Sequence, residues 1–492
     1  MADTPPVPVT IVIFGASGDL TYRKLIPALY NNFHKGRLPQ PARIVGFARR
    51  PWDNDFFAAR LQEGTRQFSP TLFNPQTWDA FAQTLHYFQG NLDAADDYQK
   101  LRLFLQTLEQ GPAHRLYYLA TAPKFYGPAA RHLGAAGMAD QAEGWRNIVV
   151  EKPFGRDLAS AQALNRAIHA VFNEGQVYRI DHYLGKETAQ NIIFFRFANT
   201  IFEPVWNRRY VKNVQISVTE SVDIGHRAGY YDRAGVLRDM FQNHLLQLLT
   251  LIAMEPPASL DADAVRNEKA KVLSAIRPVA PAGVVRAQYR GYCEAPGVAP
   301  NSGTATYAAL KLHIDNWRWQ GVPFYLRSGK ALRRKHTEIT IQFQAPPDIM
   351  FNLAQSDGFT PNTLSICVQP DEGIHLKFET KVPDSVRESR SVDMEFHYRD
   401  SFGDRALPDA YERLLLDALK GDASLFARSD EIELAWRLID PILAAVEAGT
   451  APPPVTYQPG SWGPPEADAL LAADGAFWRL GCGGHQNQAG AP

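Results

Sequence analysis

The sequence predicts two domains of different fold class. The first is an α/β domain with a doubly wound parallel sheet, and the second is a larger α+β domain with a mainly antiparallel sheet covered by helices. A length of 492 residues favours two or three domains. Apolar, β-branched runs alternate with helical stretches in the first half of the chain. After about residue 185, strand-like runs follow one another closely and several alternate apolar with polar residues.

The first half repeats the order strand, helix, strand. The run 8–14 is apolar and ends at Gly15, and a helical stretch separates it from the run 43–48. Further strand candidates lie at 115–121, 146–151 and 177–183, and the helical stretches include 95–109, 124–137 and 157–173. This order predicts a parallel sheet with helices on both faces.

The second half is richer in strands. Its candidates are 211–222, 304–314, 337–343, 363–369, 373–380 and 391–398, with two long helices at about 232–254 and 409–420. Alternating residues along several of these runs are typical of half-buried antiparallel strands. The most apolar run, 245–254, is too short to span a bilayer and predicts a buried helix, so we expect no membrane partner.

Charge and cysteine content restrict the class of protein. Lys plus Arg number 51 and Asp plus Glu number 52, a formal net charge of −1, so a nucleic-acid partner is not expected. The first ten residues lack the basic and apolar regions of an export signal. Cys293, Cys367 and Cys482 lie far apart in the sequence, so we expect neither a disulfide framework nor a zinc knuckle, and a cytoplasmic location fits.

A turn of small residues follows the first predicted strand. Its members are Gly15, Ala16, Ser17, Gly18, Asp19 and Leu20. Small side chains let backbone N–H groups and the dipole of the next helix face a phosphate. The spacing is G-x-x-G rather than the full dinucleotide-binding motif, so an ordinary tight turn is the alternative.

Two arginines end the second predicted strand. NAD-binding folds usually carry an acidic residue there, which holds the ribose hydroxyls. A guanidinium at Arg49 or Arg50 binds a 2′-phosphate that a carboxylate would repel. We therefore expect NADP as the cofactor, with NAD as a weaker alternative. Without the strand context, two solvated surface arginines would be the simpler interpretation.

Ionisable residues gather at 179–187, where the strand–helix alternation stops. Open α/β sheets bind ligands beyond the carboxyl ends of their strands, so this segment is a candidate site. His182, Tyr183 and Lys186 are placed to clamp a phosphate, and His182 and Lys186 share a face if a helical turn begins here. The alternative is a strand end with solvated charges.

A histidine on the long predicted helix is the candidate general base. His244 precedes a strongly apolar stretch, where a lone histidine is more often a satisfied core residue. A carboxylate partner would change that interpretation, and Asp181 is the candidate. The basic residues at 327–330, together with Lys335, form either a solvated loop or part of an anion pocket. Residues 151–153 are a possible hinge between the domains.

Six segments together resemble the glucose-6-phosphate dehydrogenase family. They are GASGDLTYRKL (15–25), EKPFGRDL (151–158), RIDHYLGKE (179–187), RDMFQNHLLQ (238–247), PFYLRSGKAL (323–332) and DAYERLLLDALKGD (409–422). They occur in the family's order over nearly the whole chain, and RIDHYLGKE is highly specific. The resemblance implies a Rossmann-type coenzyme domain over 1–180 and a substrate-binding and oligomerisation domain over 181–492, hence a homodimer or homotetramer.

The resemblance also implies roles for single residues. The expected reaction is NADP-dependent oxidation of D-glucose 6-phosphate at C1 to 6-phosphoglucono-δ-lactone, the first oxidative step of the pentose phosphate pathway. His244 resembles the general base, Asp181 its orienting partner, and His182, Tyr183 and Lys186 the phosphate-binding positions. Positions that hold the sugar or its phosphate are Lys152, Glu220, Asp239, Lys330, Lys335 and Gln369. Coenzyme contacts are Gly15 to Leu20, Arg49, Tyr126 and Lys152, with Arg50 adjoining, and no metal is expected.

Two other functions stay open. A dehydrogenase of free sugars would share the glycine turn and the EKP segment, but a neutral sugar gives the cations His182, Lys186, Lys330 and Lys335 no partner. A regulator that binds NADP without catalysis need not keep a histidine, a carboxylate partner and a phosphate clamp together. An assay for NADPH formation separates these functions.

Overall fold

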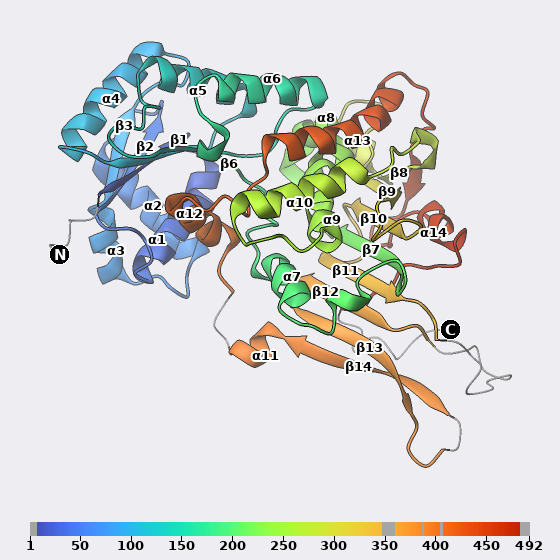
Figure 1. Ribbon diagram of the computed structural model, residues 1–492. Helices are drawn as coiled ribbons and strands as arrows, with labels where there is room; N and C mark the ends of the chain where they lie inside the picture. The colour runs from blue at the N-terminus through green and yellow to red at the C-terminus, as the bar shows by residue number, and fades with distance from the viewer. Residues whose placement is uncertain (1–6, 347–359, 386–387, 404–406, 483–492) are drawn as a thin grey trace. The chain divides into compact units, whose positions relative to one another are not determined.

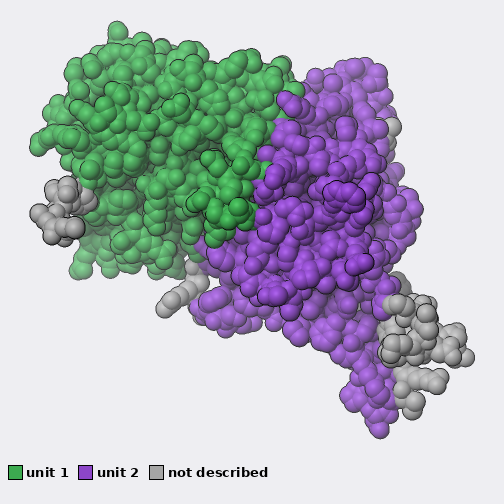
Figure 2. Space-filling view, viewed as in Figure 1, with its two compact units in different colours: residues 1–186, 257–267, 408–433 green, residues 187–256, 268–407, 434–492 purple. Residues whose placement is uncertain are grey.

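The computed structural model describes residues 7–346, 360–385, 388–403 and 407–482, and it contains two compact units (Figures 1 and 2). Unit 1 comprises 1–186, 257–267 and 408–433, and unit 2 comprises 187–256, 268–407 and 434–492. Segments from the second half of the chain thus belong to unit 1. The predicted domains, 1–180 and 181–492, stay a prediction.

Unit 1 is built on a six-stranded parallel sheet in the order β3-β2-β1-β4-β5-β6. Its strands are β1 (Val9–Phe14), β2 (Ala42–Ala48), β3 (Leu85–Gln89), β4 (His114–Leu119), β5 (Arg146–Val150) and β6 (Val177–Arg179). Every residue of β1 is buried, as expected for a strand covered on both faces. The strand order reverses between β1 and β4, and doubly wound sheets bind ligands at that point.

Helices cover both faces of the parallel sheet (Figure 1). One layer contains α1 (Ile26–His34), α2 (Asn54–Phe68) and α12 (Ala410–Lys420), and the other contains α4 (Ala95–Glu109), α5 (Tyr126–Ala135) and α6 (Leu158–His169). The side chain of Asp157 accepts a hydrogen bond from the backbone of Ser160 and so caps α6. The predicted doubly wound sheet is confirmed, and β3 is a strand that the sequence analysis missed.

Unit 2 is built on a nine-stranded sheet in the order β14-β13-β12-β11-β7-β10-β9-β8-β15. Its strands are β7 (Val211–Thr219), β8 (Val285–Tyr289), β9 (Tyr307–His313), β10 (Pro323–Gly329), β11 (His336–Phe343), β12 (Thr363–Gln369), β13 (Gly373–Lys381), β14 (Ser389–His397) and β15 (Val455–Tyr457). Among the described strands of this nine-stranded sheet, only the pairs β7–β10 and β8–β15 are parallel. The predicted, mainly antiparallel sheet is confirmed, although β8, β10 and β15 were not among the predicted strands.

Helices of unit 2 pack against this sheet. The predicted helix at 232–254 is formed by consecutive segments: α8 (Ala228–Val236), the π-helix η6 (Leu237–Leu245) and α9 (Leu246–Ala253). The segment η6 contacts β10, and α7 (Glu187–Phe197) contacts β12. Every residue of α9 is buried, as predicted from the apolar run. The other helices of four residues or more are α3 (Pro75–Ala82), η1 (Thr21–Leu25), α10 (Ala262–Ala275), α11 (Tyr398–Phe402), α13 (Ser429–Glu447) and α14 (Pro465–Ala472).

Among the described residues, no helix combines the length and the apolar character that crossing a membrane requires.

The central strand β7 is buried on both faces, not half-buried as its alternating pattern predicts. Val214 and Ile216 point to one face and Gln215 and Ser217 to the other, and all are buried. The C-terminal segment 477–482 covers the polar face. Gln215 donates from Nε2 to the carbonyl oxygen of Phe477 at 2.9 Å, and its Oε1 accepts from the backbone of Arg479 at 2.9 Å.

A disulfide bond fixes the end of the C-terminal segment, so the expectation of no disulfide was wrong. Cys367 on β12 and Cys482 are joined, with their Cα atoms 5.8 Å apart and a sequence separation of 115. Sequence distance was a poor guide because the sheet brings the C-terminal segment back to β12. Cys293 is an exposed free cysteine.

Candidate active site

The residues predicted to bind a coenzyme follow the carboxyl ends of strands in unit 1. Gly15 follows β1, Arg49 follows β2, and Lys152 lies just after β5. Tyr126 begins α5, shortly after β4. Carboxyl ends of parallel strands meet at one edge of a sheet, so the structure brings these residues to one edge.

The turn after β1 requires glycine at its first position. Gly15 has φ +89°, and a Cβ atom there would lie 2.2 Å from the carbonyl oxygen of Ala120. The backbone of Gly15 donates to Phe47 at 2.9 Å, and the backbone of Gly18 donates to Gly15 at 2.9 Å. Gly18 and Asp19 are exposed, so the turn presents its backbone to solvent at the switch point of the sheet.

Both arginines after β2 are exposed at the same edge. Tyr87 donates from its hydroxyl to the carbonyl oxygen of Arg50 at 2.7 Å, and Gln89 donates to that of Arg49 at 3.3 Å. The Arg50 guanidinium lies 5.3 Å from the ring of Trp52. Hydrogen bonds thus hold the backbone of the pair, while the side chains reach into solvent.

The turn after β6 brings together the three residues predicted to clamp a phosphate. The rings of His182 and Tyr183 lie 4.9 Å apart, and Nζ of Lys186 lies 4.7 Å from the Tyr183 ring. Backbone bonds from Leu184 to Asp181 and from Lys186 to Tyr183 make this a tight turn, not the helical turn we considered. His182, Tyr183 and Lys186 are together because the turn folds back on itself.

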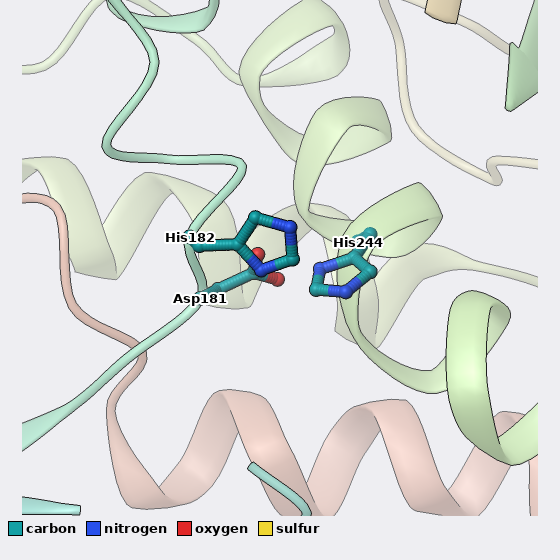
Figure 3. A group of neighbouring side chains, drawn as sticks. All are labelled: Asp181, His182 and His244. Carbon is teal, nitrogen blue, oxygen red and sulfur yellow. The ribbon is translucent and has the colours of Figure 1, made fainter. Parts of the chain in front are cut away.

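Asp181 begins the same turn (Figure 3). It is 2 % exposed, and its Oδ1 accepts a hydrogen bond from the backbone of Tyr183 at 3.0 Å. This bond fixes the orientation of the carboxylate within unit 1.

A buried acid beside Lys152 was missed as a site component. The Glu151 carboxyl accepts from the Tyr118 hydroxyl at 2.5 Å and from Tyr411. Burial raises the pKa of Glu151, and these hydrogen bonds partly offset the rise. The network fixes the backbone just before Lys152. The signal in the sequence was the EKP segment itself, in which we weighed only the lysine.

Four of the predicted sugar-binding residues share one edge of the sheet in unit 2. Glu220 and Lys330 follow the parallel strands β7 and β10, and the Glu220 backbone donates to Gly329 at 3.0 Å. Lys335 precedes β11 and Gln369 ends β12, and both of these strands run antiparallel to their neighbours in that region. Gln369 donates from Nε2 to Thr337 at 3.0 Å.

An ion pair and two tyrosines organise this edge. Nζ of Lys330 lies 2.5 Å from Oε2 of Glu220 and 5.1 Å from the ring of Tyr231. The Tyr230 hydroxyl donates to Asp239 at 3.5 Å. Burial raises the pKa of Tyr231, and the charges of Asp239 and Glu220 add to the rise. The structure therefore gathers Glu220, Asp239 and Lys330, while Lys335 is exposed.

His244 lies in the π-helical segment η6 (Figure 3). The residue is 1 % exposed, and its backbone N–H donates to Oδ1 of Asn243 at 2.6 Å. Wider turns of this kind occur often at functional sites. His244 and Asp181 belong to different units, so their pairing stays a prediction.

Fold and site geometry define a nicotinamide-dinucleotide-binding oxidoreductase. Residues 12–191 match the model "Glucose-6-phosphate dehydrogenase, NAD binding domain", and residues 193–479 match "Glucose-6-phosphate dehydrogenase, C-terminal domain". The chain belongs to the glucose-6-phosphate dehydrogenase family.

Individual relatives match this chain over nearly its full length. Glucose-6-phosphate 1-dehydrogenase of Chlamydia pneumoniae is 44 % identical, with 96 % of each chain covered. That of Bacillus subtilis is 42 % identical, with 95 % of this chain and 97 % of the relative covered. A solved glucose-6-phosphate dehydrogenase in complex with its substrate glucose-6-phosphate is 35 % identical, with a TM-score of 0.88 over 98 % of this chain and 100 % of the other. The enzyme from Mycobacterium avium gives a TM-score of 0.84 at 36 % identity, covering 96 % and 99 %.

Proposed function

We propose that the protein oxidises D-glucose 6-phosphate at C1 with NADP, giving 6-phosphoglucono-δ-lactone. The observation that carries the substrate is the group formed by His182, Tyr183 and Lys186 on the turn after β6. An ammonium, an imidazole and a phenol hydroxyl suit a phosphate, whereas a neutral sugar would leave the ammonium without an anionic ligand. The substrate complex of the relative with a TM-score of 0.88 supports the same substrate.

His244 serves as the general base and Asp181 as its positioning carboxylate in this proposal. One imidazole nitrogen of His244 takes the C1 hydroxyl proton as the C1–H bond breaks and the C1=O double bond forms, so no cation develops at C1. The carboxylate accepts a hydrogen bond from the other ring nitrogen, fixes the tautomer and stabilises the imidazolium. The burial of both side chains keeps competing water away.

The other residues proposed to bind the substrate differ in whether their charge is already balanced. Glu220 already balances the charge of Lys330, so this pair, with Asp239 and Gln369, suits sugar hydroxyls better than a phosphate. Binding energy from the phosphate, remote from C1, then orients the sugar for reaction. The exposed Lys335 adds a cation at the rim.

The residues of unit 1 fit a nicotinamide dinucleotide. A Cβ at position 15 would clash, and the exposed backbone that follows offers donors to a pyrophosphate. Residues 15–20, Tyr126 and Lys152 would hold the dinucleotide, and Arg49 with Arg50 would bind the 2′-phosphate that distinguishes NADP from NAD. When bound, the cofactor supplies the acceptor for the hydride that leaves C1.

The experiment is a comparison of kcat/KM for glucose 6-phosphate and glucose with each cofactor. We expect a large preference for the phosphorylated sugar and for NADP. Equal values for the two sugars would place the phosphate site elsewhere.

A His244→Asn variant tests the base. Its kcat should fall by about 10²–10⁴-fold while substrate binding stays near normal. His313→Asn, at a histidine of β9 outside the proposed site, is the matched control. Near-normal kcat in the first variant would contradict the assignment.

We also propose a homodimer or homotetramer in the cytoplasm. Light scattering coupled to size-exclusion chromatography distinguishes the assemblies, and a monomer would contradict both. The disulfide between Cys367 and Cys482 removes the cysteine argument for a reducing compartment.

A further inference from the structure

Two neighbouring strands of unit 2 carry histidines and an acid on one face. In the antiparallel pair β13–β14, His375 lies opposite Glu395, and His397 lies opposite Gly373. Residues directly opposite, and residues two apart on a strand, point to the same face. His375, Glu395 and His397 therefore converge although 20 residues separate the first two in sequence.

Two distances within this cluster are close to the ligand–ligand separation in a metal coordination shell. Nδ1 of His375 lies 3.4 Å from Oε1 of Glu395, and Nε2 of His397 lies 3.4 Å from Oε2. One ligand atom from each residue falls within 4.8 Å of the others. Tetrahedral zinc with metal–ligand bonds of about 2.0–2.1 Å places its ligand atoms roughly 3.3 Å apart. A separation of 3.4 Å is long for an optimal hydrogen bond.

Gly373 makes room for the second histidine. A Cβ at this position would lie 3.2 Å from Nδ1 of His397 and 2.3 Å from the carbonyl oxygen of Phe396. Without a side chain there, the His397 ring approaches His375 edge to face, with ring centroids 4.9 Å apart.

The second nitrogen of each histidine ring lies in a different environment. Oδ1 of Asp371 lies 3.2 Å from Nδ1 of His397, and Nε2 of the same ring contacts Oε2 of Glu395 at 3.4 Å. Metal-ligating histidines usually have such a carboxylate behind them. His375 is 4 % exposed, and its Nε2 has no hydrogen-bond partner among the described residues.

We propose that His375, Glu395 and His397 bind a divalent transition-metal ion, zinc in particular, that joins edge strand β14 to β13. Imidazole and carboxylate ligands suit zinc, and three protein ligands leave a fourth position for water. Glu395 is exposed and His397 partly so, which gives an ion access from solvent. No metal was expected from the sequence because the ligand-spacing patterns of metal sites apply to ligands close together in the chain.

The test is a zinc titration in competition with a chromogenic chelator, monitored by the chelator's absorbance. All proteins carry Cys293→Ser, which removes the exposed thiol as a competing ligand. We expect one equivalent of zinc to be lost, or bound more than tenfold more weakly, in His397→Ala and in Glu395→Gln. Asp371→Asn should weaken binding by roughly tenfold or more, since it acts through His397.

Matched controls separate the cluster from other histidines and from misfolding. His313→Gln, on strand β9 of the same sheet, should bind zinc like the parent. Cobalt should give d–d absorption bands in the parent that are absent in the cluster variants. Glu395 is exposed, so Glu395→Gln should fold even if a histidine variant does not, and its metal-free melting temperature checks this. Equal affinity in the parent and Glu395→Gln, or no zinc uptake by the parent, would overturn the proposal.

Discussion

The disulfide between Cys367 and Cys482 makes a prediction whose size follows from the structure. The bond closes a loop of 115 residues, and chain entropy in the unfolded state gives an upper limit of about 5 kcal/mol for a loop of this length. The C-terminal segment is also held by hydrogen bonds. Glu338 accepts from the backbone of Gly481 at 2.6 Å, and Arg334 donates to the carbonyl oxygen of Cys482 at 2.7 Å. Reduction should therefore weaken unit 2 without releasing the segment completely.

Urea unfolding of the oxidised protein, with and without reductant, measures this effect. Reductant should lower the unfolding midpoint of the parent and of Cys293→Ala, but leave that of Cys367→Ala unchanged. After unfolding without reductant, a thiol-reactive dye should count one thiol per chain in the parent and none in Cys293→Ala. Three thiols per chain in parent protein equilibrated with oxidised glutathione would show that the disulfide does not form. A drop in the unfolding midpoint of Cys367→Ala as large as that of the parent would show that reductant acts elsewhere, and either result would refute the reasoning.

Three further predictions concern cofactor, substrate and pH. Arg49→Ala should raise KM for NADP by about 10- to 100-fold, the value of a charge-assisted hydrogen bond, and KM for NAD much less; equal losses would contradict the 2′-phosphate role. Lys186→Ala should raise KM for glucose 6-phosphate more than about tenfold and leave kcat/KM for glucose unchanged, which steady-state kinetics checks. Burial, with Arg327 and Arg334 nearby, lowers the pKa of His336 from 6.5 to about 3. As the pH drops below 6.5, His336 is protonated in the unfolded chain before it is protonated in the folded protein, so the free energy of unfolding falls between pH 6.5 and 3. His336→Asn should reduce that fall, which urea unfolding midpoints measured across this pH range check.

Local patterns predicted the strands whose burial is uniform. β1 is an apolar run with both faces covered, and the sequence defines it to within a residue. β3 was missed because its five residues alternate buried and partly exposed positions, which a short run does not make distinctive. The burial of Gln215 was unpredictable for another reason: the residues that cover it lie more than 250 positions later.

Site residues were predictable where chemistry and strand ends coincide. Gly15, Arg49 and the 179–187 segment each stand where a parallel strand ends, and the structure places them there. Contacts that depend on which strands pair with one another could not be predicted from local sequence patterns. The ion pair of Lys330 with Glu220 spans 110 residues and forms because β7 and β10 run parallel. The same reasoning accounts for the unforeseen cluster on β13 and β14.

The direction in which the Asp239 side chain points depends on how many residues the π-helical segment η6 contains. Each residue of an α-helix advances roughly 100° about the axis, so deleting one residue to restore ordinary bonding would rotate everything before the deletion. The apolar helix α9, which follows, would stay sealed in the core. Asp239, near the start of η6, lies before a deletion made in the second half of the segment and would turn relative to α9. A one-residue deletion in the second half of η6 would therefore displace Asp239 from the proposed sugar site and leave the packing of α9 intact.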